Sequence, residues 1–553
     1  MEKKGNTSNF LVQGSILAIA SIVSRIIGLV YRMPMTAIIG DLGNNYYGAA
    51  FEVYNLMLLI SSYSIPLAVS KIVSAHAAKN EMKTVYRVVK CSLLFALSTG
   101  FIACLIVWFG AGFLTDTLLR TPLSIYALRV LAPTLVIFSV LGVLRGFFQG
   151  MGTMMPTAIS QIIEQLVNAF ISVLAAYFLF QYGTKVGGVL GNTREYSAAF
   201  GAAGGTFGTT MGAIAGLLFV IFVFAIFRPG FRKKMKRERE KGVMDYGSIL
   251  KVLVLTIVPV LLSTTIYNIS SIVDQGIFKN IAAMQNYSQY NVDIWWGVFT
   301  GKYKVLINVP IAIASAMAAS AVPSLTGAFT RRDLREVRVK TNKAIRFVMV
   351  IAFPCAVGMG VLASPILQLL FGDASMLAAN QMRLGAVAII FYSLSTLTNG
   401  ILQGINRLQE PVKNAIIALI LHILVLLILL FGFKLNIYAV VIATVVYPAL
   451  MCILNGRSIR RYLHYRQEIR RTFIIPGICS AIMGVAVYFL YKGVMLLLSI
   501  NSIATIAAIF VGAVLYGILL LLFRGLSASE IATFPKGRTL VQIFMKLHLL
   551  PRR

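Results

Sequence analysis

The sequence predicts an all-α polytopic membrane protein with fourteen transmembrane helices, in two six-helix lobes followed by two further helices. The chain has 553 residues, of which 58% are hydrophobic and only 12% charged, whereas about 25% of the residues of a soluble domain are charged. Its apolar runs are long and continuous, while the strands of a membrane barrel alternate with period two. Only helices then satisfy every backbone polar group in lipid. A water-soluble enzyme is therefore excluded.

Each predicted span is a run of about 20 or more mostly apolar residues, the length that crosses a bilayer. The first run follows Lys3 and Lys4 and continues through Arg25 and Arg32 without a small-residue cleavage site, so we interpret it as a helix and not a signal peptide. The predicted spans are 10–39, 47–75, 85–110, 124–148, 155–182, 199–228, 249–272, 303–328, 341–371, 376–402, 411–433, 436–456, 472–495 and 499–523.

The net charge of +32 is distributed unevenly between the spans. Of the 50 Lys and Arg residues, 38 fall on the side of the N-terminus and 10 on the other side, and the remaining two are Arg25 and Arg32 within the first span. This asymmetry predicts that both termini lie in the cytoplasm. The basic runs Arg228–Lys251, Arg331–Arg346 and Arg457–Arg471 then serve orientation and contact with anionic membrane lipids, and nucleic acid is not an expected partner.

An internal repeat relates two parts of the chain. Gly146-x-x-Gln149-Gly150 followed by Pro156 is echoed by Gly400-x-x-Gln403-Gly404 followed by Pro411, and Ile65-Pro66 is echoed by Val322-Pro323. The offset of six spans is even, so the two lobes have parallel topology and should enclose a central cavity. The predicted parts are an N-terminal lobe (1–240), a C-terminal lobe (241–456), two extra spans (457–525) and an interfacial cytoplasmic tail (526–553) that contains an in-plane helix at Leu540–Leu550.

Enzyme signatures are absent from the sequence. Gly297-Val-Phe-Thr-Gly301-Lys302 comes nearest to a phosphate-binding loop, but it is one residue short, so no ATPase site, catalytic residue or cofactor is predicted. The four histidines are scattered, which argues against a metal site. The longest segment outside the membrane is 273–302, where the pair Trp295 and Trp296 suits the membrane interface.

Charged residues inside the spans are the informative candidates, because each costs about 3 kcal/mol at mid-helix on insertion scales. Arg25 and Arg32 lie seven residues apart in the first span, which stacks both guanidiniums on one helix face about 10 Å apart. Pro34 should then kink or end the helix. The alternative for Arg32 is that it reaches to the outer interface.

The acidic counterparts are Glu52, Glu164 and Asp274. Glu164 belongs to a polar stripe at helical spacing, which is formed by Gln161, Glu164, Gln165 and Asn168. This stripe either holds helices together or lines the cavity. Asp274 alternatively marks a helix end. We add Arg145 and Gln149 from the repeated motif, although the inside bias of positive charge alone explains Arg145. The run Gly204, Gly208, Gly212 and Gly216 predicts close helix packing.

Paired arginines without an ATP site favour an anionic substrate, because the planar guanidinium matches phosphate oxygens bidentately. A cationic-drug exporter would instead need an aromatic and acidic cavity. A membrane-embedded glycosyl polymerase or ligase would need acid and base groups in a sizeable outer loop, and 273–302 offers only Asp274 and Asp293.

Two stretches of sequence carry a family resemblance. S-R-x-x-G-x-x-x-R at 24–32 and R-G-F-F-Q-G-M-G-x-M-x-P-T-A-x-S-Q-x-x-E-Q at 145–165, with the fourteen-span layout, resemble the multidrug/oligosaccharidyl-lipid/polysaccharide (MOP) exporter superfamily. The resemblance is to its polysaccharide branch, that of stage V sporulation protein B and the YtgP-like lipid II flippases. It implies a MATE/MurJ-like pair of lobes that works by alternating access. It also implies a location in the bacterial cell membrane and export of an undecaprenyl-diphosphate-linked sugar, the peptidoglycan precursor lipid II.

The MurJ-type relatives have essential arginines in the first helix, which Arg25 matches by its context, while Arg32 is one residue further along. We therefore expect a monomeric flippase in which Arg25 and Arg32 clamp the diphosphate of a lipid-linked anionic oligosaccharide. Glu52, Glu164 and Asp274 would supply counter-charges or bind a coupling ion (Na⁺ or H⁺), with the membrane potential as the other source of energy. The alternative is a cation-coupled multidrug antiporter of the same superfamily.

Overall fold

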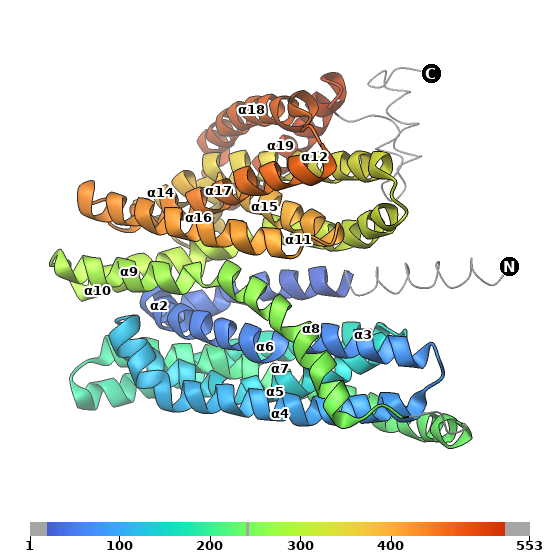
Figure 1. The fold of residues 1–553 in the computed structure, drawn as a ribbon. Coiled ribbons are helices and arrows are strands. Elements are labelled where there is room, and N and C mark those ends of the chain that lie inside the picture. The colour runs from blue at the N-terminus through green and yellow to red at the C-terminus, as the bar shows by residue number, and fades with distance from the viewer. Residues whose placement is uncertain (1–18, 239–242, 526–553) are drawn as a thin grey trace. The chain divides into compact units, whose positions relative to one another are not determined.

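The fold is helical throughout the part of the chain that the structure, a computed structural model, describes, residues 19–238 and 243–525 (Figure 1). The predicted tail helix at 540–550 and the start of the first span lie outside these residues. Helices lie at all fourteen predicted ranges as far as the described residues cover them. Ten of the described helices are long and apolar enough to cross a membrane, or eleven if one bent pair is a single span. The predicted number of fourteen spans is therefore not confirmed.

The chain divides into two compact units, which do not follow the order of the sequence exactly. The first contains residues up to Gly301 together with Leu427–Ile437, and the second contains Lys302–Leu426 and the chain from Tyr438 onward. The lobe boundary expected after residue 240 stays a prediction.

The first unit begins with the helix Ile19–Val30, which is separated from the next helix at Tyr31. Pro34 has no N–H to donate to the carbonyl of Val30, which explains this interruption. The turn that ends the first predicted span is at Gly40, whose φ of 66° favours glycine. The labelled helices of this unit are α2 (Arg32–Leu58), α3 (Ile65–Ala77), α4 (Met82–Gly112), α5 (Ile125–Gly150), α6 (Met155–Leu190), α7 (Thr193–Arg237), α8 (Tyr246–Asn268), α9 (Ser270–Met284) and α10 (Gln289–Val298).

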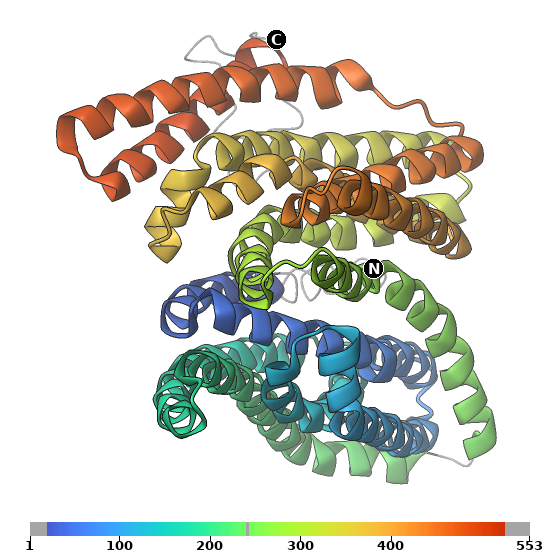
Figure 2. The ribbon, with the colours of Figure 1, turned by 90° about the vertical axis from the view of Figure 1, so that its left-hand side faces the viewer.

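The second unit is built from the remaining helices, and its C-terminal pair α18 and α19 packs along α12 and α13 (Figure 2). The crossing of α11 with α15 corresponds in the repeat to the crossing of α3 with α5 in the first unit, and both pairs are in contact. The helices are α11 (Lys304–Thr330), α12 (Leu334–Val361), α13 (Ala363–Phe371), α14 (Met376–Gly385), α15 (Ala388–Gly404), α16 (Gln409–Leu427), α17 (Ile437–Leu463), α18 (Ile475–Leu498) and α19 (Asn501–Leu522).

Short segments of π-helix and one of 3₁₀-helix interrupt or join these helices. Two of the π segments, Phe299–Tyr303 and Ile428–Gly432, lie where the chain passes between the units. The others are Leu59–Tyr63, Phe113–Leu118 and Arg470–Ile474, and the 3₁₀ turn is Pro122–Ser124.

The closest helix pair in the first unit is α6 with α7, as the glycine run predicts. A Cβ on Gly204 would lie 2.4 Å from the carbonyl oxygen of Ala175, and one on Gly212 would lie 2.5 Å from that of Glu164. These glycines let the two backbones approach within a distance that any side chain would prevent. The predicted close packing is confirmed at Gly204, Gly208 and Gly212, whereas a Cβ on Gly216 would make only ordinary contacts.

We predict that Gly208→Ala destabilises the first unit by about 1–3 kcal/mol, the usual cost of overpacking. The added Cβ would meet the Ser172 Oγ at 2.1 Å and its backbone nitrogen at 2.4 Å. Gly216→Ala is the control, because its Cβ would meet nothing closer than 3.4 Å. The unfolding midpoint in detergent should fall for the first variant and not for the second. Equal behaviour of the two would contradict the packing argument.

An ion pair in the second unit joins the short connection between α13 and α14 to the π-helical segment Phe299–Tyr303, which precedes α11. Lys302 Nζ lies 2.6 Å from Asp373 Oδ2, and the N–H of Ser375 donates to Asp373 Oδ1 at 2.7 Å. Burial opposes ionisation of this carboxyl, but the bonds from Lys302 and Ser375 outweigh it and lower the pKa of Asp373. The ionised carboxylate is therefore the form that stabilises the fold.

We predict an acid-dependent loss of stability from Asp373. Because its folded-state pKa is lowered, the stabilisation is present above the unfolded value of about 3.9 and is lost as the pH falls through the folded value. Asp373→Asn should therefore make the unfolding midpoint less sensitive to pH below about 5. The exposed carboxylate variant Asp116→Asn should keep the wild-type profile. An unchanged profile for Asp373→Asn would show that the ion pair does not contribute.

Candidate functional site

The motif 145–150 at the end of α5 is a junction of three helices. Gly146 lies against α3, where a Cβ would come within 2.7 Å of the Pro66 carbonyl oxygen. Phe147 and Phe148 are buried and make edge-on ring contacts with phenylalanines of α7. Gln149 is half-buried and donates to the Thr157 hydroxyl across the turn into α6, at 3.5 Å. Most of the motif is thus explained by packing.

Arg145 of this motif forms an ion pair inside the first unit. Its NH2 group lies 2.9 Å from Glu164 Oε2, and its Nε donates to the Ser160 hydroxyl at 2.9 Å. The two side chains are 11% and 14% exposed. Arg145 therefore joins α5 to α6, and neutralises the carboxylate that the sequence pattern placed inside the membrane.

The polar stripe of α6 contacts three neighbours. Glu164 meets α5, while Asn168 accepts a hydrogen bond from Ser172 at 2.9 Å and packs at Gly212 of α7. Gln161 contacts the first helix, since the Ser21 hydroxyl donates to its side chain and the Ser24 hydroxyl to its carbonyl, both at 3.4 Å. The stripe was expected either to hold helices together or to line a cavity, and at 164 and 168 these contacts favour helix association. At 161 they place the polar end of α6 beside the helix that carries Arg25.

Arg32 lies over an aromatic shelf formed by two residues of α2, Tyr47 and Phe51. Its guanidinium carbon is 4.1 Å from the centre of the Tyr47 ring and 6.0 Å from that of Phe51, and the two rings stack at 5.3 Å. Tyr47 is fully buried, whereas Arg32 is half-buried and Arg25 exposed. The ring contact stabilises the cation, and stacking of a guanidinium leaves its in-plane N–H groups for oxygen acceptors.

The other two predicted acidic residues lie elsewhere in the first unit. Glu52 is half-buried on α2, and Asp274 is buried on α9, within the helix and not at its end. The structure thus brings Arg145, Glu164 and Gln161 together around α6, and holds Arg32 on α2.

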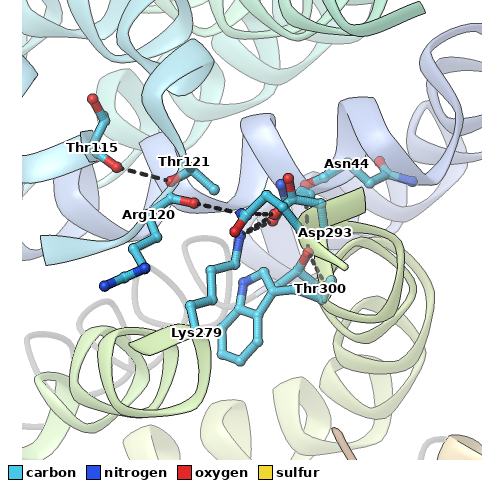
Figure 3. Close-up of polar contacts among 10 residues, drawn as sticks. Asn44, Thr115, Arg120, Thr121, Lys279, Asp293 and Thr300 are labelled. Atoms are coloured by element: carbon cyan, nitrogen blue, oxygen red, sulfur yellow. Dashed lines mark hydrogen bonds and ion pairs between the residues drawn. The ribbon is translucent and has the colours of Figure 1, made fainter. Parts of the chain in front are cut away.

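A second buried cluster, which the sequence did not indicate, joins α9 and α10 to α2 (Figure 3). Lys279 Nζ donates to Asp293 Oδ1 and to Asn45 Oδ1, both at 2.7 Å. Gln289 donates to the same aspartate oxygen at 3.1 Å and to the Arg120 carbonyl at 3.0 Å. The Lys279 and Asp293 side chains are 1% and 8% exposed. The cluster therefore fixes the α9–α10 hairpin in the first unit.

The structure corrects the expectation of a loop at 273–302, while the location of this segment outside the membrane stays a prediction. Only 285–288 separate α9 from α10, and the rest is helical. Trp296 is fully buried in the protein, and its ring centre lies 5.7 Å from that of Phe278 and 5.2 Å from that of Phe299. The apolar residues at helical spacing around Phe278 were the available signal.

Comparison with known proteins identifies the family of this chain. A sequence profile described as polysaccharide biosynthesis protein matches residues 11–329, more than half of the chain. The chain belongs to the polysaccharide biosynthesis protein family. It is 26% identical to "Lipid II flippase MurJ" of Bacillus subtilis (strain 168) over 500 residues, 87% of this chain and 88% of that one. It is 23% identical to "Stage V sporulation protein B" of the same organism over 538 residues, 96% and 99% of the two chains.

Solved structures share the fold. A structure of "Lipid II flippase MurJ, inward closed conformation" matches with a TM-score of 0.64 at 15% identity, covering 92% of this chain and 98% of that chain. An inward-facing multidrug resistance MATE transporter of the MOP superfamily matches with 0.62 at 16% identity, covering 81% and 98%. The protein is thus a multi-pass membrane protein of the polysaccharide biosynthesis protein family, with a MurJ/MATE-like fold.

We predict that Lys279→Met destabilises the protein by about 3–5 kcal/mol, because it leaves a buried carboxylate without its partner. The double variant Lys279→Met/Asp293→Leu should recover most of that loss, since apolar pairs of similar volume replace buried ion pairs at little cost. Both are measured as unfolding midpoints in detergent. If the single variant is as stable as the double one, the pair does not hold the hairpin.

Proposed function

We propose that the protein is a flippase for an undecaprenyl-diphosphate-linked oligosaccharide, the peptidoglycan precursor lipid II. It moves the head group from the inner to the outer leaflet of a bacterial cell membrane by alternating access, with both termini in the cytoplasm. The observation that carries the proposal is the half-buried Arg32, whose guanidinium is stacked 4.1 Å from the Tyr47 ring centre. The sequence similarity to the MurJ flippase supports the substrate class.

Arg25 and Arg32 are the residues that bind the diphosphate in this proposal. Arg145 contributes less to diphosphate binding, because its guanidinium already donates hydrogen bonds to Ser160 and Glu164. Glu52 and Asp274 supply counter-charges that bind a coupling ion (H⁺ or Na⁺), while Glu164 supplies its counter-charge to Arg145 and resets the site. The membrane potential is the other source of energy. Gln149, near the end of α5, and Gln161, in the second turn of α6, contribute polar groups to the substrate site on either side of the connection 151–154.

The proposal predicts loss of transport without loss of protein for Arg25→Ala. Each charge-assisted bond to phosphate contributes about 1.5–3 kcal/mol, so transport should fall about tenfold to a hundredfold. Arg32→Lys should be intermediate, because lysine keeps the charge but not the planar fork. Exposed Lys185 on α6 provides the control Lys185→Ala. The measurement is reconstitution into liposomes with fluorescent lipid II, read as a change of leaflet.

Complementation of a flippase-depleted strain tests the same claim in cells. Full rescue by Arg25→Ala, at wild-type protein levels in the membrane, would remove Arg25 from the mechanism. A teichoic acid precursor in the same liposomes tests the choice of sugar. Transport of that precursor and not of lipid II would keep the flippase and reject lipid II as the substrate.

The second candidate is a cation-coupled multidrug antiporter, which the likeness to a MATE transporter at a TM-score of 0.62 favours. Such a protein needs an acidic group to hold the cation, and Glu164 is instead paired with Arg145 at 2.9 Å. Drug resistance on overexpression, without an effect of depletion on wall synthesis, would favour the antiporter.

A further inference from the structure

Two arginines of the second unit stack on one tyrosine ring, near the ends of α15 and α17. The guanidinium carbon of Arg407 lies 4.4 Å from the ring centre of Tyr462, and that of Arg461 lies 5.9 Å from it. Both arginines are exposed, and the tyrosine is half-buried. In the part of the chain that the structure describes, neither guanidinium is paired with a carboxylate. Their in-plane N–H groups are therefore available to oxygen acceptors.

A polar network holds the ring of Tyr462 in place. Its hydroxyl donates to Glu410 Oε1 at 3.0 Å, and the Ser458 hydroxyl donates to the other oxygen of that carboxylate at 3.2 Å. Asn414 donates to Ser458 at 3.2 Å and to Asn455 at 2.9 Å, and these three residues are buried. The carboxylate of Glu410 thus holds hydroxyl groups and not the guanidiniums. A ring that is already fixed loses little entropy when a ligand binds beside it.

The turn that contains Arg407 has a defined backbone. Asn406 follows α15 in the left-handed region, with φ of 59°, and the N–H of Arg407 donates to the carbonyl of Leu402 at 2.9 Å. This bond belongs to a helix-ending motif in which glycine or asparagine takes the left-handed position. In the first copy of the repeat, the corresponding connection 151–154 has no basic residue. The basic turn is therefore a feature of the second copy.

The arrangement fits a diphosphate. Each planar guanidinium matches the oxygens of one phosphoryl group with two parallel N–H bonds, so two guanidiniums at one ring offer partners to two linked phosphoryl groups. A phospholipid head group with a single phosphate would engage one of them. Residues 403–410 and 457–471 lie between predicted spans, on the side predicted to be cytoplasmic. The diphosphate of a lipid in the inner leaflet is therefore the ligand that uses both arginines.

We propose that Arg407 and Arg461, stacked on Tyr462, form a capture site for the diphosphate of the lipid-linked substrate. The proposal rests on the proposed function, and adds to it a second phosphate site that binds the substrate at the inner leaflet before transport. Arg25 and Arg32 remain the transport site. Loss of the capture site should weaken uptake of the substrate and leave the transport rate of the loaded protein unchanged.

Binding of inorganic diphosphate tests the capture site apart from transport. In nanodiscs of phosphatidylcholine, radiolabelled diphosphate should still bind to a protein whose transport site is removed by Arg25→Ala and Arg32→Ala. In that background, Arg407→Gln or Arg461→Gln should weaken binding about tenfold, the effect of losing one charge-assisted hydrogen bond. The matched control is Arg460→Gln, which removes the same charge from an exposed neighbour on α17 outside the stack. Absence of binding, or an equal loss in the control, would overturn the proposal.

Substitution of the ring separates stacking from charge. Tyr462→Phe keeps the aromatic face and should bind diphosphate nearly as the wild type does. Tyr462→Leu keeps both arginines but removes that face, so binding should fall about threefold, the effect of losing an exposed cation–π contact. Binding by Tyr462→Leu at the wild-type level would show that the ring does not organise the site, and would contradict the proposal.

The lipid composition distinguishes the two sources of phosphate. Diphosphate binding that persists when phosphatidylglycerol replaces phosphatidylcholine in the nanodiscs supports a diphosphate site. Complete displacement of diphosphate by phosphatidylglycerol would identify a contact with phospholipid head groups instead, and would overturn the proposal.

The transport assay separates failure of the capture site from failure of the function. In liposomes, the double variant Arg407→Gln/Arg461→Gln should raise the lipid II concentration for half-maximal transport about tenfold, without a change in the maximal rate. If the wild type moves lipid II and the double variant needs no more of it than Arg460→Gln does, the capture site is wrong and the flippase stands. If the wild type binds diphosphate at these arginines but does not move lipid II, the proposed function fails, and the capture role with it.

Discussion

Charge in a hydrocarbon environment governs this protein, because an ionised side chain within a span must be paired, stacked or in contact with water. The first unit shows each of the first two solutions. Arg145 is paired with Glu164 between α5 and α6, and Arg32 is stacked on Tyr47. Arg25 is exposed, so in a membrane it requires the third solution.

These different environments assign different roles to cations of the same kind. A guanidinium that already donates to a carboxylate and a hydroxyl, as Arg145 does, contributes mainly to the position of its helices. A stacked or exposed guanidinium keeps donors for a ligand. The geometry therefore concentrates the proposed phosphate binding of the first unit on the first helix and the start of α2.

Hydropathy predicted the fold well, because the membrane imposes both the length and the apolarity of each helix. Helices lie at the predicted ranges, and the turn after the first span is at Gly40. The loop expected at 273–302 is mostly helical, because Lys279 and Asp293, which look like loop charges in the sequence, form an ion pair between α9 and α10. The candidate site was predicted by residue type only. Local sequence does not show that Glu164 would take Arg145 as its partner, or that aromatic rings would hold Arg32, because these contacts join separate helices.

The most direct test of the account is whether the arginine positions are in contact with water. In a variant without the five native cysteines, Arg25→Cys and Arg32→Cys should react with a membrane-impermeant methanethiosulfonate in proteoliposomes. Undecaprenyl diphosphate should protect both. If neither cysteine reacts until the protein is denatured, while a cysteine at exposed Lys185 reacts at once, the side chains face acyl chains or packed protein, and the proposed phosphate site is contradicted.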